Sequence, residues 1–193
     1  MIDYITGSVT ELNPAFVVVE CNGIGYSINI SLTTYADLEK SVKCTVYIHE
    51  AVREDAWVLY GFSARDERVL FRQLITVSGV GANTARMMLS SLNPSELSGA
   101  ITGADVNALK AIKGIGLKTA QRIIVDLKDK IGKPSASGEI FTFSDNTARE
   151  EALSALVMLG FARNSASKVV DSLLKENKSL AVEDIVRKAL KLL

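Results

Sequence analysis

The middle third of the chain repeats itself at an offset of 35 residues. Residues 78–89 read SGVGANTARMML, and residues 113–124 read KGIGLKTAQRII. The two copies share both glycines, an apolar residue between them, and a Thr-Ala pair that follows. Each copy lies between a short helical pattern and an apolar helical one. This repeat predicts two helix-hairpin-helix units, and it constrains the fold more than any other feature of the sequence.

The elements that the repeat preserves are those that an anion-binding turn requires. Glycines let the backbone adopt conformations closed to other residues and let a ligand approach closely. The apolar residue between them, Val80 or Ile115, is expected to point inward and hold the two helices together. The first amides of the second helix lack intrahelical partners and lie at the positive end of the helix dipole. A phosphate group fits such a site and would be bound without base information.

The second copy carries more positive charge than the first. Lys118 and Arg122 lie four residues apart on one predicted helix face, whereas the first copy has Asn83 in place of Lys118 and Arg86 nearby. We therefore expect the second copy to attract phosphate more strongly. The residues predicted to contact DNA are Gly79, Gly81, Ala82, Asn83, Thr84, Lys113, Gly114, Gly116, Lys118, Thr119 and Arg122.

The charge distribution supports a polyanionic ligand, although the net charge of the chain is zero. Residues 1–63 contain 3 Lys/Arg and 8 Asp/Glu, and residues 64–133 contain 11 and 6. Residues 134–193 contain 8 of each sign. The repeat therefore lies in the basic segment of a chain whose charge is unevenly distributed, a pattern typical of nucleic-acid-binding proteins.

Residues 1–63 are predicted to form a five-stranded barrel of the OB type. Apolar and polar residues alternate along 16–21, 25–31, 43–52 and 56–62, and Asn22-Gly23 is a hairpin turn signal. A short helix is expected at 33–39, capped by Thr33 or Thr34.

The remainder of the chain is predicted to be helical, which makes the fold class α+β. A helix is expected over 66–77, and residues 64–131 form the tandem hairpin domain. Residues 132–146 (GKPSASGEIFTFSDN) are rich in Gly, Ser and Pro and are interpreted as a flexible linker. Residues 147–193 are expected to form a small three-helix domain.

No enzymatic, metal or cofactor site is apparent. The chain has no Gly-x-x-x-x-Gly-Lys-Ser/Thr nucleotide loop, and its single histidine, His49, has no neighbouring set of metal ligands. Cys21 and Cys44 fall in predicted strands and are interpreted as small apolar side chains. Without a membrane span or an export signal, a cytoplasmic location is expected.

Two short motifs complete the pattern. Val52-Arg53-Glu54-Asp55-Ala56 precedes Leu59-Tyr60-Gly61-Phe62, and Gly114-Ile115-Gly116 precedes Lys118-Thr119-Ala120 and Arg122. In this order they resemble the RuvA family of bacterial proteins, along the whole chain. The resemblance implies a non-catalytic scaffold that binds four-way (Holliday) DNA junctions in recombination and DNA repair. It also implies that the scaffold recruits a hexameric RuvB-type ATPase motor for branch migration.

The resemblance also assigns roles to particular residues. Glu54 and Asp55 would form an acidic pin near the centre of a homotetramer, where carboxylates repel phosphates and favour separated strands. The C-terminal domain would bind the motor through Leu156, Leu159 and Phe161, of which Phe161 is expected to be the most exposed. One tetramer or a pair of tetramers would hold the junction, and a junction resolvase is a further partner.

Two departures from the family pattern remove charge, because Asn83 and Leu117 stand where relatives often carry basic residues. Two other readings of the sequence remain open. The first is a helix-hairpin-helix repair enzyme, a glycosylase or a nuclease. A glycosylase would use Asp126 or Asp129, although the neighbouring lysines indicate a solvated face. A general duplex-binding adaptor would have the same hairpins and no junction preference.

Overall fold

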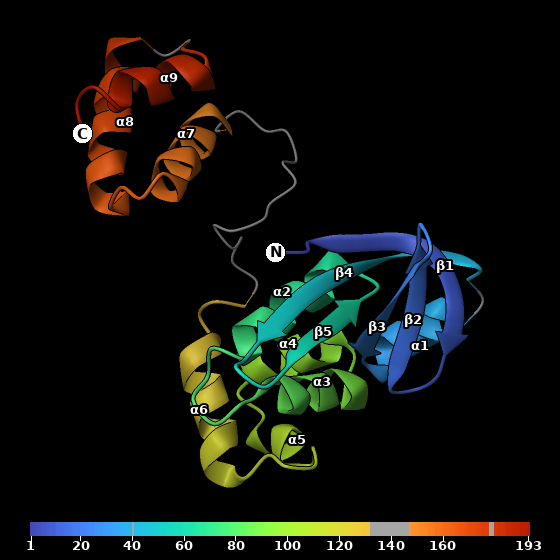
Figure 1. The fold of residues 1–193 in the computed structure, drawn as a ribbon. Coiled ribbons are helices and arrows are strands. Elements are labelled where there is room, and N and C mark those ends of the chain that lie inside the picture. The colour runs from blue at the N-terminus through green and yellow to red at the C-terminus, as the bar shows by residue number, and fades with distance from the viewer. Residues whose placement is uncertain (40, 132–146, 178–179) are drawn as a thin grey trace. The chain divides into compact units, whose positions relative to one another are not determined.

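The computed structural model describes residues 1–39, 41–131, 147–177 and 180–193 (Figure 1). It comprises two compact units, Met1–Lys133 and Pro134–Leu193, called here the N-terminal and C-terminal units. The linker predicted at 132–146 lies outside the described residues.

The N-terminal unit begins with a closed five-stranded barrel, as predicted. The strands are β1 (Tyr4–Leu12), β2 (Phe16–Cys21), β3 (Ile24–Ile30), β4 (Lys43–Val52) and β5 (Trp57–Phe62). They close in the order β1-β2-β3-β5-β4, and only the described β3–β5 pair is parallel. A short helix, α1 (Leu32–Leu38), precedes β4. This is the topology that the spacing of the alternating segments predicted.

Alternation and turn chemistry explain the barrel. Val17 and Val19 are fully buried inside it, while their neighbours along β2 are not. The β2–β3 turn places Asn22 at φ 50° and Gly23 at φ 82°, and such left-handed conformations are the ones that Asn-Gly turns supply. Gly61 is required for space, because a Cβ atom there would lie 2.4 Å from a methyl carbon of Val46.

Several predicted boundaries differ from the structure; the third strand and α1, for example, each begin one residue earlier than predicted. The cap of α1 is Ser31 rather than Thr33 or Thr34, because the Ser31 hydroxyl accepts a hydrogen bond from the Thr34 amide at 3.0 Å. The last strand begins one residue later than predicted. The helix predicted over 66–77 is α2 (Arg65–Leu74), and residues 75–77 form a tighter turn in which the Val77 amide donates to the Leu74 carbonyl.

Five helices follow the barrel and share one hydrophobic core. They are α2, α3 (Ala82–Ser91), α4 (Pro94–Thr102), α5 (Val106–Lys110) and α6 (Leu117–Leu127). The first hairpin consists of α2, residues 75–81 and α3; the second consists of α5, residues 111–116 and α6. Tyr60 and Phe62 of β5 belong to the same core, so the barrel and the hairpins are packed together.

Buried polar groups join α2 to the barrel. The Glu67 carboxylate accepts hydrogen bonds from the hydroxyls of Ser31 (2.5 Å) and Thr34 (2.7 Å). Burial raises the pKa of Glu67, although these hydrogen bonds partly oppose the effect. The Arg68 guanidinium donates to the Asp3 carboxylate at 2.7 Å and to the Ile48 carbonyl at 3.2 Å. Two neighbouring charged residues of α2, Glu67 and Arg68, therefore attach the first hairpin to the barrel through hydrogen bonds.

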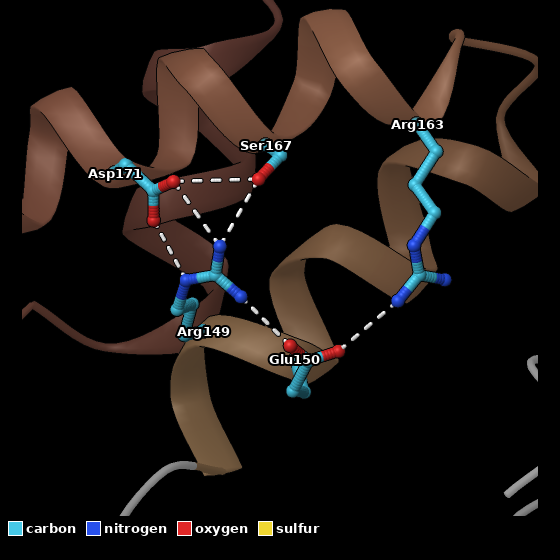
Figure 2. A network of polar contacts seen from close by, with 5 residues as sticks. All are labelled: Arg149, Glu150, Arg163, Ser167 and Asp171. Carbon is cyan, nitrogen blue, oxygen red and sulfur yellow. Dashed lines mark hydrogen bonds and ion pairs between the residues drawn. The ribbon is translucent and has the colours of Figure 1, made fainter. Parts of the chain in front are cut away.

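The C-terminal unit is a three-helix domain, as predicted. Its helices are α7 (Thr147–Met158), α8 (Arg163–Glu176) and α9 (Val182–Ala189). Arg149 of α7 binds Asp171 of α8 through two nitrogens, at 2.6 and 3.1 Å (Figure 2). These hydrogen bonds lower the pKa of Asp171 and set the register of α7 against α8. Among the described helices of both units, none combines the length and hydropathy that a membrane span needs.

Candidate nucleic-acid interface

The two hairpins have almost the same backbone geometry at their turns. Gly79 has φ 92° and Gly114 has φ 91°, in the left-handed region that glycine adopts without strain. The residues that cap the following helices, Gly81 and Gly116, have φ and ψ within one degree of each other. The repeat detected in the sequence is therefore also a repeat in the structure.

The apolar residue between each pair of glycines points inward, as predicted. Val80 and Ile115 are each 5% exposed and belong to the shared core. Their amides donate to the carbonyls of Val77 and Ile112, at 3.0 and 3.1 Å. Each turn is thus held by one buried side chain and one short-range hydrogen bond, which fixes the direction of the helix that follows.

The start of each following helix is open to a ligand. Neither α3 nor α6 has a side chain that caps its first amides within the described structure. A Cβ atom built on Gly81 or Gly116 would meet no other atom of the described chain within 4 Å. Because their φ angles are ordinary, neither the backbone nor internal packing explains glycine here. The open surface at these glycines leaves room for an external group to approach the backbone closely.

The second hairpin presents its basic side chains to solvent. Lys113 and Lys118 are exposed on either side of the turn, and Thr119 is half-buried. Arg122 is also exposed, and its guanidinium donates to the Ser78 carbonyl of the first hairpin at 3.4 Å. The structure therefore brings the two turns close together, although 44 residues separate Ser78 from Arg122.

The first hairpin uses its polar side chains differently. The Asn83 side-chain oxygen accepts a hydrogen bond from the Tyr60 hydroxyl at 3.2 Å. Arg86 donates to the Ala15 carbonyl at 2.8 Å and to the Asn29 side chain at 3.2 Å. Arg86, which the sequence indicated as the nearby cation of this copy, is thus bonded to the barrel. The types of residue around Arg86 in the sequence do not predict its hydrogen bonds to Ala15 and Asn29.

The acidic turn, residues 53–56, joins β4 to β5. Glu54 and Asp55 are exposed at its tip, and the Arg53 amide donates to the Ala56 carbonyl at 2.8 Å. A pocket of about 220 Å³ lies between this turn and the first hairpin. Its lining residues are Ala51, Arg53, Asp55, Ala56, Val58, Tyr60, Gly81, Ala82, Asn83 and Thr84. The sequence did not predict this pocket, because no pattern in either segment indicates that the acidic turn and the start of α3 are neighbours.

The three predicted partner-binding residues lie in different environments. Leu156 is fully buried in the core of the C-terminal unit, so its side chain is not accessible at the surface. Leu159 is 59% exposed, and the adjacent Met158 is 80% exposed. Phe161, which was expected to be the most exposed, is instead half-buried, because its side chain packs against the core of the C-terminal unit.

The residues considered for other chemistry are dispersed. In the described parts of the chain, no three His, Cys, Asp or Glu side chains are grouped as metal ligands would be. His49 packs against the Phe71 ring, and its pKa is lowered by burial and by Arg72 and Arg68. Asp126 lies near the end of α6, and Asp129 follows it at the surface. The cysteines are free and pack against the barrel core.

Comparison with known proteins gives a consistent result. The model of the RuvA N terminal domain matches residues 1–61, that of a SAM-like helix-hairpin-helix tandem matches 71–129, and that of the RuvA C-terminal domain matches 147–193. A protein of Christiangramia forsetii named Holliday junction branch migration complex subunit RuvA is 53% identical over 99% of both chains. Proteins of the same name from Bacteroides fragilis and Porphyromonas gingivalis are each 50% identical over at least 99% of both chains. The chain belongs to the RuvA family.

Proposed function

We infer that this protein is the DNA-binding subunit of a Holliday junction branch migration complex, acting in recombination and DNA repair. It binds four-way junctions and recruits an RuvB-type hexameric ATPase motor. The observation that carries this proposal is the pair of hairpins with matching turn geometry, next to an exposed acidic turn. The names and full-length similarity of its relatives support the same function.

The hairpins hold the DNA arms through backbone amides. The free amides at the starts of α3 and α6 bind phosphate oxygens, and Gly81 and Gly116 leave room for the DNA backbone. Gly79 and Gly114 shape the turns. The segments that contact the DNA backbone also include Ala82, Asn83, Thr84 and Thr119. Positive charge comes from Lys113, Lys118 and Arg122. Since these contacts are to phosphates, binding depends on DNA shape rather than on sequence.

The acidic turn acts at the centre of the junction. In a homotetramer with four-fold symmetry, four copies of Glu54 and Asp55 surround the point where the strands exchange. Their carboxylates repel phosphates and favour a junction whose strands separate there over a continuous duplex. The same face of a second tetramer can cover the opposite side of the junction.

The C-terminal unit binds the motor. Met158 and Leu159 form an exposed apolar pair at the end of α7, and Phe161 borders it. Leu156 supports this surface from the core. ATP hydrolysis takes place in the motor, so this subunit requires no cofactor and is not an enzyme.

We assign residues 1–63 to the barrel domain, 64–131 to the hairpin domain, 132–146 to a linker and 147–193 to the motor-binding domain. Because the proposed ligand is chromosomal DNA, we place the protein in the cytoplasm. A junction resolvase is a further partner, which would act on a junction face that the tetramer leaves accessible.

A titration against a synthetic four-way junction and a linear duplex of matched sequence tests the function. We expect the junction to bind far more tightly, with little dependence on sequence. Equal affinity for both would contradict the junction-specific role and leave a general duplex-binding adaptor. Cleavage or base release on branched or damaged DNA, analysed on denaturing gels, would instead indicate an enzyme.

A further inference from the structure

The first hairpin has no free cation of its own at the place where the second has Lys118. Asn83 occupies that position, and Arg86 is engaged with Ala15 and Asn29 of the barrel. Phosphate attraction in water depends strongly on charge, because the binding of each cation to DNA releases condensed counterions. A first hairpin that relied on amides alone would hold its DNA arm more weakly than the second.

Arg53 lies near the start of α3 and carries a positive charge of the kind that Lys118 provides in the second hairpin. It lines the same pocket as Gly81, Ala82, Asn83 and Thr84, the residues that begin α3. Its side chain is exposed, and within the described residues of the N-terminal unit its guanidinium makes no hydrogen bond or ion pair. A long basic side chain without a partner therefore lines the same pocket as a helix start that has no side-chain cap, and the two together are complementary to a phosphate.

Asn83 is oriented for the same ligand. Because the Tyr60 hydroxyl donates to its side-chain oxygen, the amide nitrogen of Asn83 faces away from that bond and can donate to a further group. Tyr60 itself is 6% exposed and fixed in the core shared by the barrel and the helices. Its hydroxyl therefore holds Asn83 from a rigid position, which lowers the entropic cost of ordering Asn83 on binding.

We propose that Arg53 supplies the positive charge of the first hairpin's phosphate site, with Tyr60 as the positioning residue for Asn83. This inference rests on the proposed function and changes the role of the acidic turn. The turn carries one residue that binds an arm phosphate and two that repel phosphates at the junction centre. Arg53 also offsets the charge of Asp55, which lines the same pocket and would otherwise repel the bound phosphate.

Arg53 and its acidic neighbours, Glu54 and Asp55, should affect DNA binding in different and measurable ways. An arm phosphate is present in a linear duplex as well as in a junction. The loss of Arg53 should therefore weaken binding to both DNAs, whereas the loss of Glu54 and Asp55 should alter the preference between them. A Lys at position 83 should make Arg53 unnecessary, because it would place charge where the second hairpin has Lys118.

The experiment compares R53Q, N83K and the R53Q/N83K double variant by fluorescence anisotropy, on junction and duplex, at several salt concentrations. We expect R53Q to lower affinity for both DNAs by about 3- to 10-fold and to reduce the salt slope by about one unit. The double variant should recover both values. Lys43→Gln is the matched control, since it removes one exposed positive charge at the opposite end of β4.

A further pair of variants tests the positioning role. Tyr60→Phe keeps the packed ring and removes the hydroxyl. We expect it to weaken binding by about 2- to 3-fold when Asn83 is present and to have no effect in the N83K background, in a double-mutant cycle. Equal losses in both backgrounds would mean that the hydroxyl acts on the fold rather than on Asn83.

The outcomes distinguish this inference from the proposed function. If R53Q binds as tightly as the unaltered protein while Lys118→Ala weakens binding, Arg53 is not a phosphate ligand and the hairpin function stands. If R53Q weakens only junction binding, Arg53 acts at the junction centre instead. If R53Q weakens binding to both DNAs and N83K does not restore it, Arg53 does not supply the charge of the first hairpin's site. If R53Q, Lys118→Ala and Gly116→Ala all bind DNA as tightly as the unaltered protein, the hairpins do not bind phosphate and the proposed function is wrong.

Discussion

The two hairpins of this protein share a backbone and differ in what surrounds it. The second hairpin presents Lys113 and Lys118 directly to solvent. The first hairpin is bonded to the barrel through Glu67, Arg68 and Arg86. The φ angles of Gly79 and Gly114 agree to within one degree, and so do the φ and ψ angles of Gly81 and Gly116. The side chains around the two turns differ.

This difference separates two requirements of a phosphate-binding turn. The turn itself is determined by a glycine in the left-handed region and by one buried apolar residue, and both copies keep them. The charge can come from any element that packs nearby. In our proposal the first hairpin uses Arg53 of the β4–β5 turn, whereas the second hairpin carries its own Lys113 and Lys118.

The largest effect is expected from Gly116→Ala, which tests the open space at the start of α6. Gly116 has φ −84°, which alanine adopts without strain, and an added Cβ meets no atom within 4 Å. We expect the free energy of unfolding to fall by no more than about 1 kcal/mol, since alanine is a weaker helix N-cap than glycine. DNA affinity should fall by about 10- to 100-fold, because charge-assisted contacts to phosphate would be lost. Anisotropy and urea denaturation measure the two effects.

Gly114→Ala is compared with Gly116→Ala, because it places the same side chain in the same turn at a strained position. Gly114 has φ 91°, where an L-residue costs about 1–2 kcal/mol, so this change should lower stability as well as affinity. Gly81→Ala should reproduce Gly116→Ala in the first hairpin. A Gly116→Ala protein that binds DNA normally would show that no phosphate approaches this turn.

Lys118→Ala is expected to have the next largest effect and tests the charge of the second hairpin. Affinity should fall by about 3- to 10-fold on all DNA sequences, and the slope of log affinity against log salt should flatten by about one unit. Titrations at four or more salt concentrations on two unrelated sequences provide the measurement. A loss that depended on sequence would argue against phosphate contact.

Arg86→Gln tests the claim that the first hairpin's own arginine serves the fold. Its hydrogen bonds to Ala15 and Asn29 join α3 to the barrel. Removing them should lower the free energy of unfolding by about 1–2 kcal/mol, because hydrogen bonds from charged groups contribute about that much. The salt slope of DNA binding should not change. A flattened slope would place Arg86 on the DNA and remove the contrast between the hairpins.

Glu67 gives the smallest expected effect, a dependence of stability on pH. Burial raises its pKa above the ordinary value of 4.5, so the folded state binds this proton more tightly than the unfolded state does. The contribution of Glu67 is therefore fully present below pH 4.5 and is lost as pH rises through the higher folded-state pKa. Glu67→Gln should remove this part of the pH dependence.

Urea denaturation across that pH range, followed by the emission of the single tryptophan, Trp57 of β5, tests the Glu67 prediction. Glu11→Gln is the control, because Glu11 is exposed on β1. An unchanged pH profile in Glu67→Gln would mean that the carboxylate is not destabilised by burial, and that the anchor between the first hairpin and the barrel does not depend on its charge.

Features that depend on neighbouring residues could be predicted from the amino-acid sequence. The hairpin repeat, the inward position of Val80 and Ile115, the Asn22-Gly23 turn and the five-stranded barrel with a helix before its fourth strand all follow from spacing, backbone preferences and alternation. These signals are local, because φ restrictions and side-chain periodicity are fixed within a few positions along the chain.

Contacts between side chains from distant segments became known only from the folded structure. Ser31 rather than a threonine caps α1, Arg86 bonds to Ala15 across 71 residues, and Leu156 lies in a core rather than at a surface. The pocket shared by Arg53 and Asn83 belongs to the same class. Such contacts depend on how whole elements pack, and packing is set by the combined shape of many buried side chains rather than by the pattern around any one of them.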